Sequence, residues 1–527
     1  MNRKRFWTHV ITPAVILALL SSTALTGCKK EAVKSDSDEL SYWCTINNGV
    51  AASYANLGDT PMAQNLEKLT GIKVKYIHPA QGQETEQFNL LLNSKQMPDM
   101  IEYNFYTFAG GPEKAIGDGY ILPLNDLIEN HSPNLKKFLA ENPEIKKMIT
   151  TDNQNYYVYP FIRGDDSLKV YTGPIVRKDW LDDLGLSIPE TIDEWHTVLT
   201  AFKNEKGAKA PFATTSGNDG FIKILNRGDF IGAFGITGGF YLDKGKVTYG
   251  YARSEYKDFL DTYSQWFKEG LIDPDYATTT SRELDNFVLT GRTGSSVQMT
   301  GGGIGKWTIE GRTSEPRFEM VAAPHPVMNK GDKPEFGQKD WSYMPQGTPA
   351  ITTSCQNPEL AAKFLDFGYS EEGMLAYNFG TEGVSYNMVD GYPTYTDLIL
   401  KDADGLSVSQ AMAKYIRASY SGPFIQMKEY GEQYFELPQQ KDSLVVWANS
   451  NMDDHLMPYI TFLAEESDEM AKIQQNVEKH AMEYSLNVIM GKESTATFDA
   501  YISQLNSYGL ERLLEIYNVA LLRYNQR

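Results

Sequence analysis

Side chains of the types that perform catalysis are scattered along this chain. The seven histidines stand singly, with neither a His-Glu-x-x-His pattern nor a group of Cys and His at ligand spacing. Three pairs of acids, Asp165-Asp166, Asp182-Asp183 and Glu371-Glu372, have the chemistry that glycoside hydrolysis needs. Neighbouring acids in an acidic chain are more often solvated surface, so we predict no catalytic residue, no metal site and no enzyme.

A glycine-rich segment at residues 301–306 (GGGIGK) begins like a phosphate-binding loop. Such a loop needs glycine at its first position and Ser or Thr after the lysine to bind magnesium. Thr300 and Trp307 occupy these two positions, so the segment does not predict a nucleotide site. A Gly-x-Ser-x-Gly elbow is also missing, and we expect no cofactor.

Cys28 is the residue for which the sequence predicts a covalent modification. Basic residues 3–5 precede an apolar run at 10–20 (VITPAVILALL), which is too short for a membrane span and typical of a signal peptide. Leu25-Thr26-Gly27-Cys28 then resembles the lipobox of bacterial lipoproteins, whose cysteine carries acyl chains such as palmitate and becomes residue one. The alternative is an ordinary signal peptide with a coincidental cysteine.

Residues 1–27 are therefore a predicted signal peptide, and residues 28–40 a flexible, lipid-anchored tether at the extracytoplasmic face of the cell membrane. No later apolar run approaches the roughly 20 residues of a spanning helix. Removing residues 1–27 takes away three positive charges and changes the net charge from −19 to −22. A chain this acidic is a poor partner for nucleic acid, and we expect a monomer that contacts the membrane through its lipid alone.

Cys44 and Cys355 are the two other cysteines. An extracytoplasmic location would permit a disulfide between them, whereas buried free thiols are common and nothing in the sequence requires the bond. Both alternatives stay open.

Hydrophobic periodicity predicts alternating strands and helices near the start of the mature chain. Strands are expected at residues 39–46, at 72–77 and from 98 onward, with amphipathic helices at 59–69 and 83–93 between them. This βαβαβ order predicts a mostly parallel sheet covered by helices.

Further elements follow in the same alternating manner. Residues 170–176 predict a strand, and Thr191 with Glu194 predicts the capping box of a helix that runs to Phe202. Other helices are expected to begin at 178 and to span 256–268, 358–367, 470–490 and 498–524.

A series of motifs in a fixed order resembles the extracellular solute-binding protein family 1, the sugar-type receptors of ABC importers. The resemblance covers nearly the whole mature chain and is closest to the long lipoprotein branch that includes the alginate-binding proteins. It rests on residues 70–74 (TGIKV), 98–100 (PDM), 176–202, 289–299 (LTGRTGSSVQM), 358–366, 380–384 (GTEGV) and 508–525.

This resemblance implies an α/β, two-lobed periplasmic-binding-protein-like fold with a ligand cleft between the lobes. Lobe 1 would comprise residues 41–172 with 347–400, and lobe 2 residues 173–346 with 401–527. The implied function is a receptor that binds an oligosaccharide or sugar derivative and delivers it to the permease subunits of an ABC importer. A tethered polysaccharide-degrading enzyme, an adhesion lipoprotein, and a receptor for another solute such as a peptide are the alternatives.

One segment departs from the alginate-binding relatives, which carry an acidic, Asn-rich calcium loop after the helix that ends near Phe202. Here residues 203–209 read KNEKGAK, with three lysines and one glutamate. Calcium requires six or more oxygen ligands, so we predict no calcium at this position.

Three tryptophans are candidates for the cleft because an indole face packs on the C–H face of a pyranose. Trp43 ends the first strand, Trp307 follows the glycine-rich segment, and Trp341 precedes the second crossing between lobes. Core packing is the competing interpretation for each.

Four further residues complete the candidate site. Tyr103 and Asn104 follow the third strand, where cleft loops begin in this family. Arg163 has a guanidinium able to bind a carboxylate or two hydroxyls, although a surface ion pair is an equal alternative. Glu382, in the Gly-x-Glu-Gly signature, would accept a hydrogen bond from a sugar hydroxyl or make a structural one.

Overall fold

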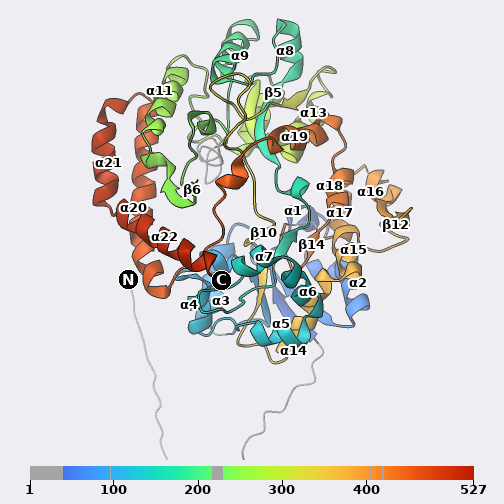
Figure 1. Ribbon diagram of the computed structural model, residues 1–527. Coiled ribbons are helices and arrows are strands. Elements are labelled where there is room, and N and C mark those ends of the chain that lie inside the picture. Colours follow the sequence, from blue (N-terminus) through green and yellow to red (C-terminus); the bar gives the residue numbers. More distant parts are fainter. Residues whose placement is uncertain (1–38, 95, 216–228, 404, 418–419) are drawn as a thin grey trace, which may run out of the picture. The chain divides into compact units, whose positions relative to one another are not determined.

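The computed structural model describes residues 39–94, 96–215, 229–403, 405–417 and 420–527 (Figure 1). Cys28, the predicted signal peptide and nearly all of the predicted tether lie outside the described residues. Among the helices in the described ranges, none is both long enough and apolar enough to cross a membrane.

The first sheet contains four strands in the order β11-β3-β1-β2. The three N-terminal strands are parallel and β11 runs antiparallel to β3, so the predicted parallel βαβαβ unit is confirmed and gains an antiparallel edge. The strands and their connecting helices are β1 (Glu39–Trp43), α2 (Pro61–Thr70), β2 (Lys73–Ile77), α3 (Glu84–Ser94), β3 (Met100–Tyr103) and β11 (Thr348–Ile351).

Helix α2 shows how the local sequence sets these boundaries. Thr60 caps its N-terminus by accepting from the backbone N–H of Ala63, and proline stands at the first helical position. Gly71 ends it in the left-handed conformation at φ 69°, which glycine adopts without steric cost. Further helices around the first core are α1 (Asn48–Ala51), α4 (Gly111–Gly117), α5 (Asn125–His131), α6 (Pro133–Glu141), α7 (Pro143–Met148), α14 (Pro358–Asp366), α15 (Glu371–Phe379) and α17 (Val408–Tyr415).

The second sheet has three strands in the order β8-β5-β9, and both pairings are antiparallel. The predicted capping box is present on α9, where the Thr191 hydroxyl accepts from the Glu194 backbone N–H and the Glu194 carboxylate accepts from the Thr191 N–H. The surrounding elements are β5 (Thr172–Arg177), α8 (Lys178–Leu184), α9 (Ile192–Glu205), α11 (Glu255–Lys268), α12 (Ser281–Leu289), β8 (Ser295–Met299), η6 (Thr300–Gly305), α13 (Lys306–Gly311), β9 (Met320–Ala322) and α19 (Pro438–Ala448), and a hairpin of β6 (Phe240–Asp243) and β7 (Lys246–Tyr249).

A third, small sheet of order β10-β4-β14 lies where the chain passes between the first two. Its strands are β4 (Phe161–Arg163), β10 (Tyr343–Met344) and β14 (Ile425–Gln426). The chain leaves β4 for β5 of the second sheet, returns from β9 through β10 to β11 of the first, and leaves β14 again for α19. Three crossings therefore meet at this sheet, and its register places Gln426 beside Arg163.

The first two sheets carry separate hydrophobic cores. Tyr42, Met100 and Phe364 belong to the first, and Val176, Trp195 and Phe259 belong to the second. Residues 408–426, predicted for lobe 2, contribute Ala413 and Phe424 to the first core. A small hairpin of β12 (Tyr386–Val389) and β13 (Tyr392–Tyr395) packs with α16 (Asp397–Leu400), α17 and α18 (Lys428–Tyr434).

Three helices close the chain, and the last of them contributes to both cores. They are α20 (Ala464–Ile489), α21 (Phe498–Ser507) and α22 (Leu510–Asn525), seen in red in Figure 1. The stretch predicted as one helical region from 498 to 524 breaks at Gly509, whose φ of 102° is left-handed. Leu510 at the start of α22 joins the second core, and Ala520 near its end joins the first.

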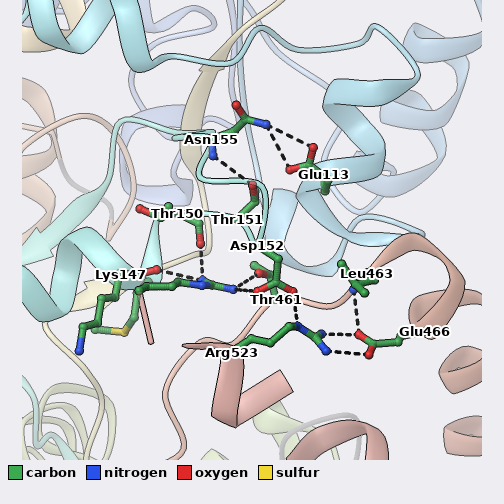
Figure 2. A network of polar contacts seen from close by, with 12 residues as sticks. Glu113, Lys147, Thr150, Thr151, Asp152, Asn155, Thr461, Leu463, Glu466 and Arg523 are labelled. Carbon is green, nitrogen blue, oxygen red and sulfur yellow. Dashed lines mark hydrogen bonds and ion pairs between the residues drawn. The ribbon is translucent and has the colours of Figure 1, made fainter. Parts of the chain in front are cut away.

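The end of α22 is fixed by an ion-pair network (Figure 2). The Asp152 carboxylate lies 3.0 Å from Nε of Arg523 and 2.5 Å from Nη2 of Arg527. Arg523 also pairs with Glu466 in the first turn of α20, and Arg527 donates to the Thr461 hydroxyl. Because Asp152 and Arg527 are almost fully buried, these contacts are shielded from solvent.

Candidate ligand-binding groove

Three adjoining cavities of about 380, 460 and 260 Å³ share their walls. Tyr434 lines all three, Tyr420 and Tyr430 line the first and third, and Gly301 and Gly302 line the first and second. We call this joined space the tyrosine groove. Its extent suits a ligand of several linked units better than a single small one.

Elements of both main sheets supply the walls. Asn47, in the loop that follows β1, comes from the first sheet, and η6 follows the end of β8 in the second. The small third sheet supplies Arg163 and Gln426 between them. Carboxyl ends of strands thus converge on the groove, as they do at the ligand sites of open α/β sheets.

Arg163 is buried in this groove between two aromatic rings. Its guanidinium carbon lies 4.6 Å from the ring centre of Tyr171 and 5.4 Å from that of Tyr420. Nη1 donates to the carbonyl of Leu168, and Nη2 lies 3.7 Å from a carboxylate oxygen of Asp340. Nε is buried and has no hydrogen-bond partner among the described residues.

Gln426 presents the complementary chemistry next to it. Its side-chain oxygen is buried and also lacks a partner within the described part of the chain. The Arg163 Nε–H is a donor and the Gln426 oxygen an acceptor, and the register of β4 and β14 places the two residues side by side. A hydroxyl group both donates and accepts, so one sugar hydroxyl has the chemistry to satisfy both.

Tyr430 and Tyr434 form an aromatic surface in the groove. They are one turn apart on α18, and their rings stack with centroids 5.9 Å apart and an interplanar angle of 5°. Burial, with smaller contributions from Tyr420 and Glu436, raises the pKa of Tyr434 to about 12. At neutral pH this phenol is therefore uncharged and keeps its proton as a hydrogen-bond donor.

The glycine-rich segment forms the facing wall. Residues 300–305 make a π-helical turn, and a Cβ added at Gly301 would lie 3.2 Å from the Tyr434 hydroxyl. Glycine at this position therefore lets the backbone approach the tyrosine closely. The segment that fails as a phosphate loop is part of the groove.

Of the seven ligand-binding residues predicted from the sequence, Arg163 lines the groove. Trp43 and Trp307 are only 4% and 1% exposed. Trp43 packs against Phe88 and Tyr103 in the first core, and the Trp307 indole N–H donates to Asp285 at 2.7 Å. Neither indole lines the groove, because each ring is enclosed by its own core.

The other four predicted residues also lie outside the lining. Trp341 donates to the carbonyl of Met457 at 2.7 Å, and Tyr103 stacks on Phe88 with centroids 3.6 Å apart. Asn104 has a buried side-chain oxygen without a partner among the described residues, and Glu382 is exposed at a turn.

The four groove tyrosines, Tyr171, Tyr420, Tyr430 and Tyr434, escaped the sequence-based prediction. The Tyr-x-x-x-Tyr spacing at 430 and 434 was the available signal, because it places both rings on one face of a helix. The pairing of β14 with β4, which brings this helix to Arg163, joins segments far apart in the sequence and has no local signal.

Cys44 and Cys355 are free buried thiols in the structure, which decides between the two alternatives left open above. Burial raises the pKa of each thiol to about 12. Both are therefore protonated and unreactive at neutral pH.

Two of the three lysines in residues 203–209 have partners of their own. Lys206 lies 2.7 Å from a carboxylate oxygen of Asp183, and Lys203 donates to the carbonyl of Glu269. In the described ranges no group of three or more His, Cys, Asp and Glu side chains is arranged to hold a metal ion. That this loop binds no calcium stays a prediction.

A larger cavity of about 550 Å³ lies elsewhere, beside α3. Eight residues between Gly82 and Asn93 line it, none of them aromatic, and no second element stands opposite them among the described lining residues. A surface formed by one helix cannot enclose a ligand, so the tyrosine groove is the better candidate site.

A family model described as bacterial extracellular solute-binding protein matches residues 54–375. The chain belongs to this family. The predicted family and the α/β, two-lobed fold are confirmed, and members of this family are extracellular binding proteins.

Three similar proteins share most of their length with this member of the family. The fructooligosaccharide ABC transporter substrate-binding protein FusA of Streptococcus pneumoniae serotype 4 is 24% identical, over 86% of this chain and 85% of its own. The polygalacturonan/rhamnogalacturonan-binding protein YtcQ of Bacillus subtilis is 23% identical, over 87% of each. The crystal structure of alginate-binding protein AlgQ2 without calcium ion is 25% identical, with a TM-score of 0.74, and covers 92% of this chain and 97% of its own.

Proposed function

We propose that this protein is an extracytoplasmic receptor that binds an oligosaccharide or sugar derivative in the tyrosine groove and delivers it to an ABC importer. The observation that carries this proposal is a groove with stacked tyrosines that also holds a buried donor and a buried acceptor without partners in the described part of the chain. Aromatic faces pack on the C–H faces of sugar rings, while buried polar atoms orient their hydroxyls. The similar proteins are named for binding or transporting carbohydrate chains.

Delivery requires that the permease distinguish the loaded receptor from the empty one. The three chain crossings at the sheet β10-β4-β14 make this sheet the natural hinge between lobes, and it carries Arg163 and Gln426. A ligand that bridges the hinge and both walls would favour closure of the lobes around it. We assign residues 408–417 and 420–426 to lobe 1 with 41–172 and 347–400, because Ala413 and Phe424 belong to its core.

The anchor is part of the same proposal. A lipid on Cys28 would hold the receptor at the extracytoplasmic face of the membrane, where released ligand meets the permease. We propose a lipidated monomer whose partners are its ligand and the permease subunits.

Thermal-shift screening of the detergent-extracted full chain against an oligosaccharide library tests the ligand class. A sugar present at about 100 times its dissociation constant should stabilise the native state by about 2.7 kcal/mol. With an unfolding entropy of about 2.1 cal/mol/K per residue, that corresponds to a rise in Tm of roughly 2–3 °C. Failure of every carbohydrate to raise Tm, together with a rise from a peptide or another solute, would overturn the proposal.

The same mixtures separate a receptor from a hydrolase. A receptor returns its ligand unchanged, so no new reducing ends should accumulate during long incubation with polysaccharides and oligosaccharides. Release of reducing ends that scales with protein concentration would favour the tethered enzyme instead.

A further inference from the structure

The charged side chains that line the tyrosine groove are few. Among its described lining residues they are Arg163, Lys306, Glu310 and Glu436, two of each sign. The third cavity has no charged residue among those described, and is lined by amides, hydroxyls and apolar side chains. The groove therefore offers no excess of positive charge to a ligand.

Both cations of the groove already have acidic partners. The Lys306 ammonium lies 2.6 Å from a carboxylate oxygen of Asp285. The Arg163 guanidinium has Asp340 at 3.7 Å, and the Tyr171 hydroxyl donates to the same carboxylate at 2.7 Å and so helps to hold it there. Neither Asp285 nor Asp340 is among the lining residues, so each neutralises its cation from outside the groove.

The contacts of Arg163 also decide what it can bind. One terminal nitrogen donates to the Leu168 carbonyl, and the other faces Asp340. Nε is the guanidinium nitrogen that is buried without a hydrogen-bond partner among the described residues. A carboxylate is bound most strongly by two parallel N–H groups of one guanidinium, and the Asp340 carboxylate that faces Nη2 would repel a ligand carboxylate placed to use both Nε and Nη2. A single N–H beside the Gln426 oxygen suits a hydroxyl, which accepts from one and donates to the other.

We infer that the tyrosine groove takes uncharged oligosaccharides and rejects polyuronates, an inference that rests on the proposed function and names its substrate class. A polyuronate has a carboxylate on every sugar residue. Inside the groove these carboxylates would lose water without gaining an unpaired cation, and some would lie near Glu310 or Glu436. The similar proteins do not settle this choice, because their names include both neutral and acidic chains.

Titration calorimetry on the detergent-extracted full chain tests the inference with two matched panels. The neutral panel contains fructo-, malto-, xylo- and galacto-oligosaccharides of three to five residues. The acidic panel contains oligogalacturonates and alginate oligomers of the same lengths. We expect at least one neutral compound to bind, and every acidic compound to bind at least about tenfold more weakly at low ionic strength.

The variant Asp340→Asn tests the cause of the selectivity. It removes the charge opposite Arg163 and keeps an oxygen that can accept from the Tyr171 hydroxyl. Freeing the guanidinium should raise the affinity for the acidic panel relative to the neutral one by about 10- to 100-fold. Asp397→Asn is the matched control, because it removes an equal charge at an exposed position outside the groove and should change neither affinity.

Each outcome decides between the claims. Acidic oligomers that bind as tightly as neutral ones would overturn the inference and leave the proposed function intact. Binding of neither panel, together with binding of a non-sugar solute, would overturn both. An unchanged selectivity ratio in Asp340→Asn would show that the pairing of Arg163 does not exclude acidic ligands, and the inference would fail.

Discussion

Replacing Tyr434 with alanine is the sharpest test of the groove. The residue lines all three cavities and is stacked on Tyr430, so its loss removes a ligand contact at the centre of the site. Losing an aromatic stacking contact costs about 1–3 kcal/mol of binding free energy. The dissociation constant should therefore rise roughly 5- to 150-fold.

The stability of the ligand-free protein should respond much less. Tyr434 is partly exposed, and its hydroxyl makes no hydrogen bond to another described residue, so few native contacts are lost. Trp307→Ala provides the contrast, because that indole is 1% exposed and bonded to Asp285. Its truncation should cost about 3–5 kcal/mol and lower Tm by roughly 3–5 °C.

Titration calorimetry with a ligand found by screening, together with thermal melts without ligand, measures both quantities. Tyr434→Phe keeps the ring and separates stacking from the hydroxyl, and Tyr508→Ala removes a partly exposed tyrosine that does not line the groove. Wild-type affinity in Tyr434→Ala would refute the placement of the site. A large fall of its ligand-free Tm would refute the claim that the residue serves binding more than folding.

Four further predictions follow from residues outside the groove. Cys28→Ser should abolish incorporation of a fatty-acid analogue in metabolic labelling. Equal labelling of the wild type and the variant would contradict the predicted lipid anchor. Cys44 and Cys355 have buried thiols with a pKa of about 12, so in the native protein both should resist iodoacetamide at pH 8. In denaturant without reductant both should react, and two unreactive cysteines there would indicate a disulfide. Asp152→Ala removes the carboxylate that pairs with Arg523 and Arg527, and should lower the free energy of unfolding, measured in urea, by about 3–5 kcal/mol. A decrease below about 1 kcal/mol would mean that water replaces the carboxylate as the partner of the two arginines. Thr191→Ala removes the N-cap of α9 and should lower the free energy of unfolding by about 1 kcal/mol. An unchanged midpoint of urea unfolding would contradict this.

The elements with a local signal were predictable from the sequence. The parallel unit of β1, β2 and β3 follows from hydrophobic alternation, and the capping box at Thr191 from side-chain spacing. The break at Gly509 was missed because an apolar pattern continues on both sides of the glycine, and only its positive φ divides α21 from α22.

The site was less predictable than the fold. Arg163 was chosen for its ability to bind a carboxylate or two hydroxyls, and it lines the candidate groove. The tryptophans were chosen for their aromatic faces, a property that suits a hydrophobic core equally well. Trp43 and Trp307 are in cores, and tyrosines from α18 form the aromatic surface. Which aromatic side chains face a groove depends on pairings such as β4 with β14, which link residues 263 positions apart at Ile162 and Ile425.

The double attachment of α22 has a consequence for how the chain acquires its structure. The first core includes Ala520 and Tyr524, and Asp152 pairs with Arg523, 371 positions downstream. The N-terminal lobe therefore cannot complete its packing until residues near 520 are available to it. Contacts of such sequence separation form slowly. Packing of the first core is therefore a late step of folding, because it has to wait until the last residues of the chain have been synthesised.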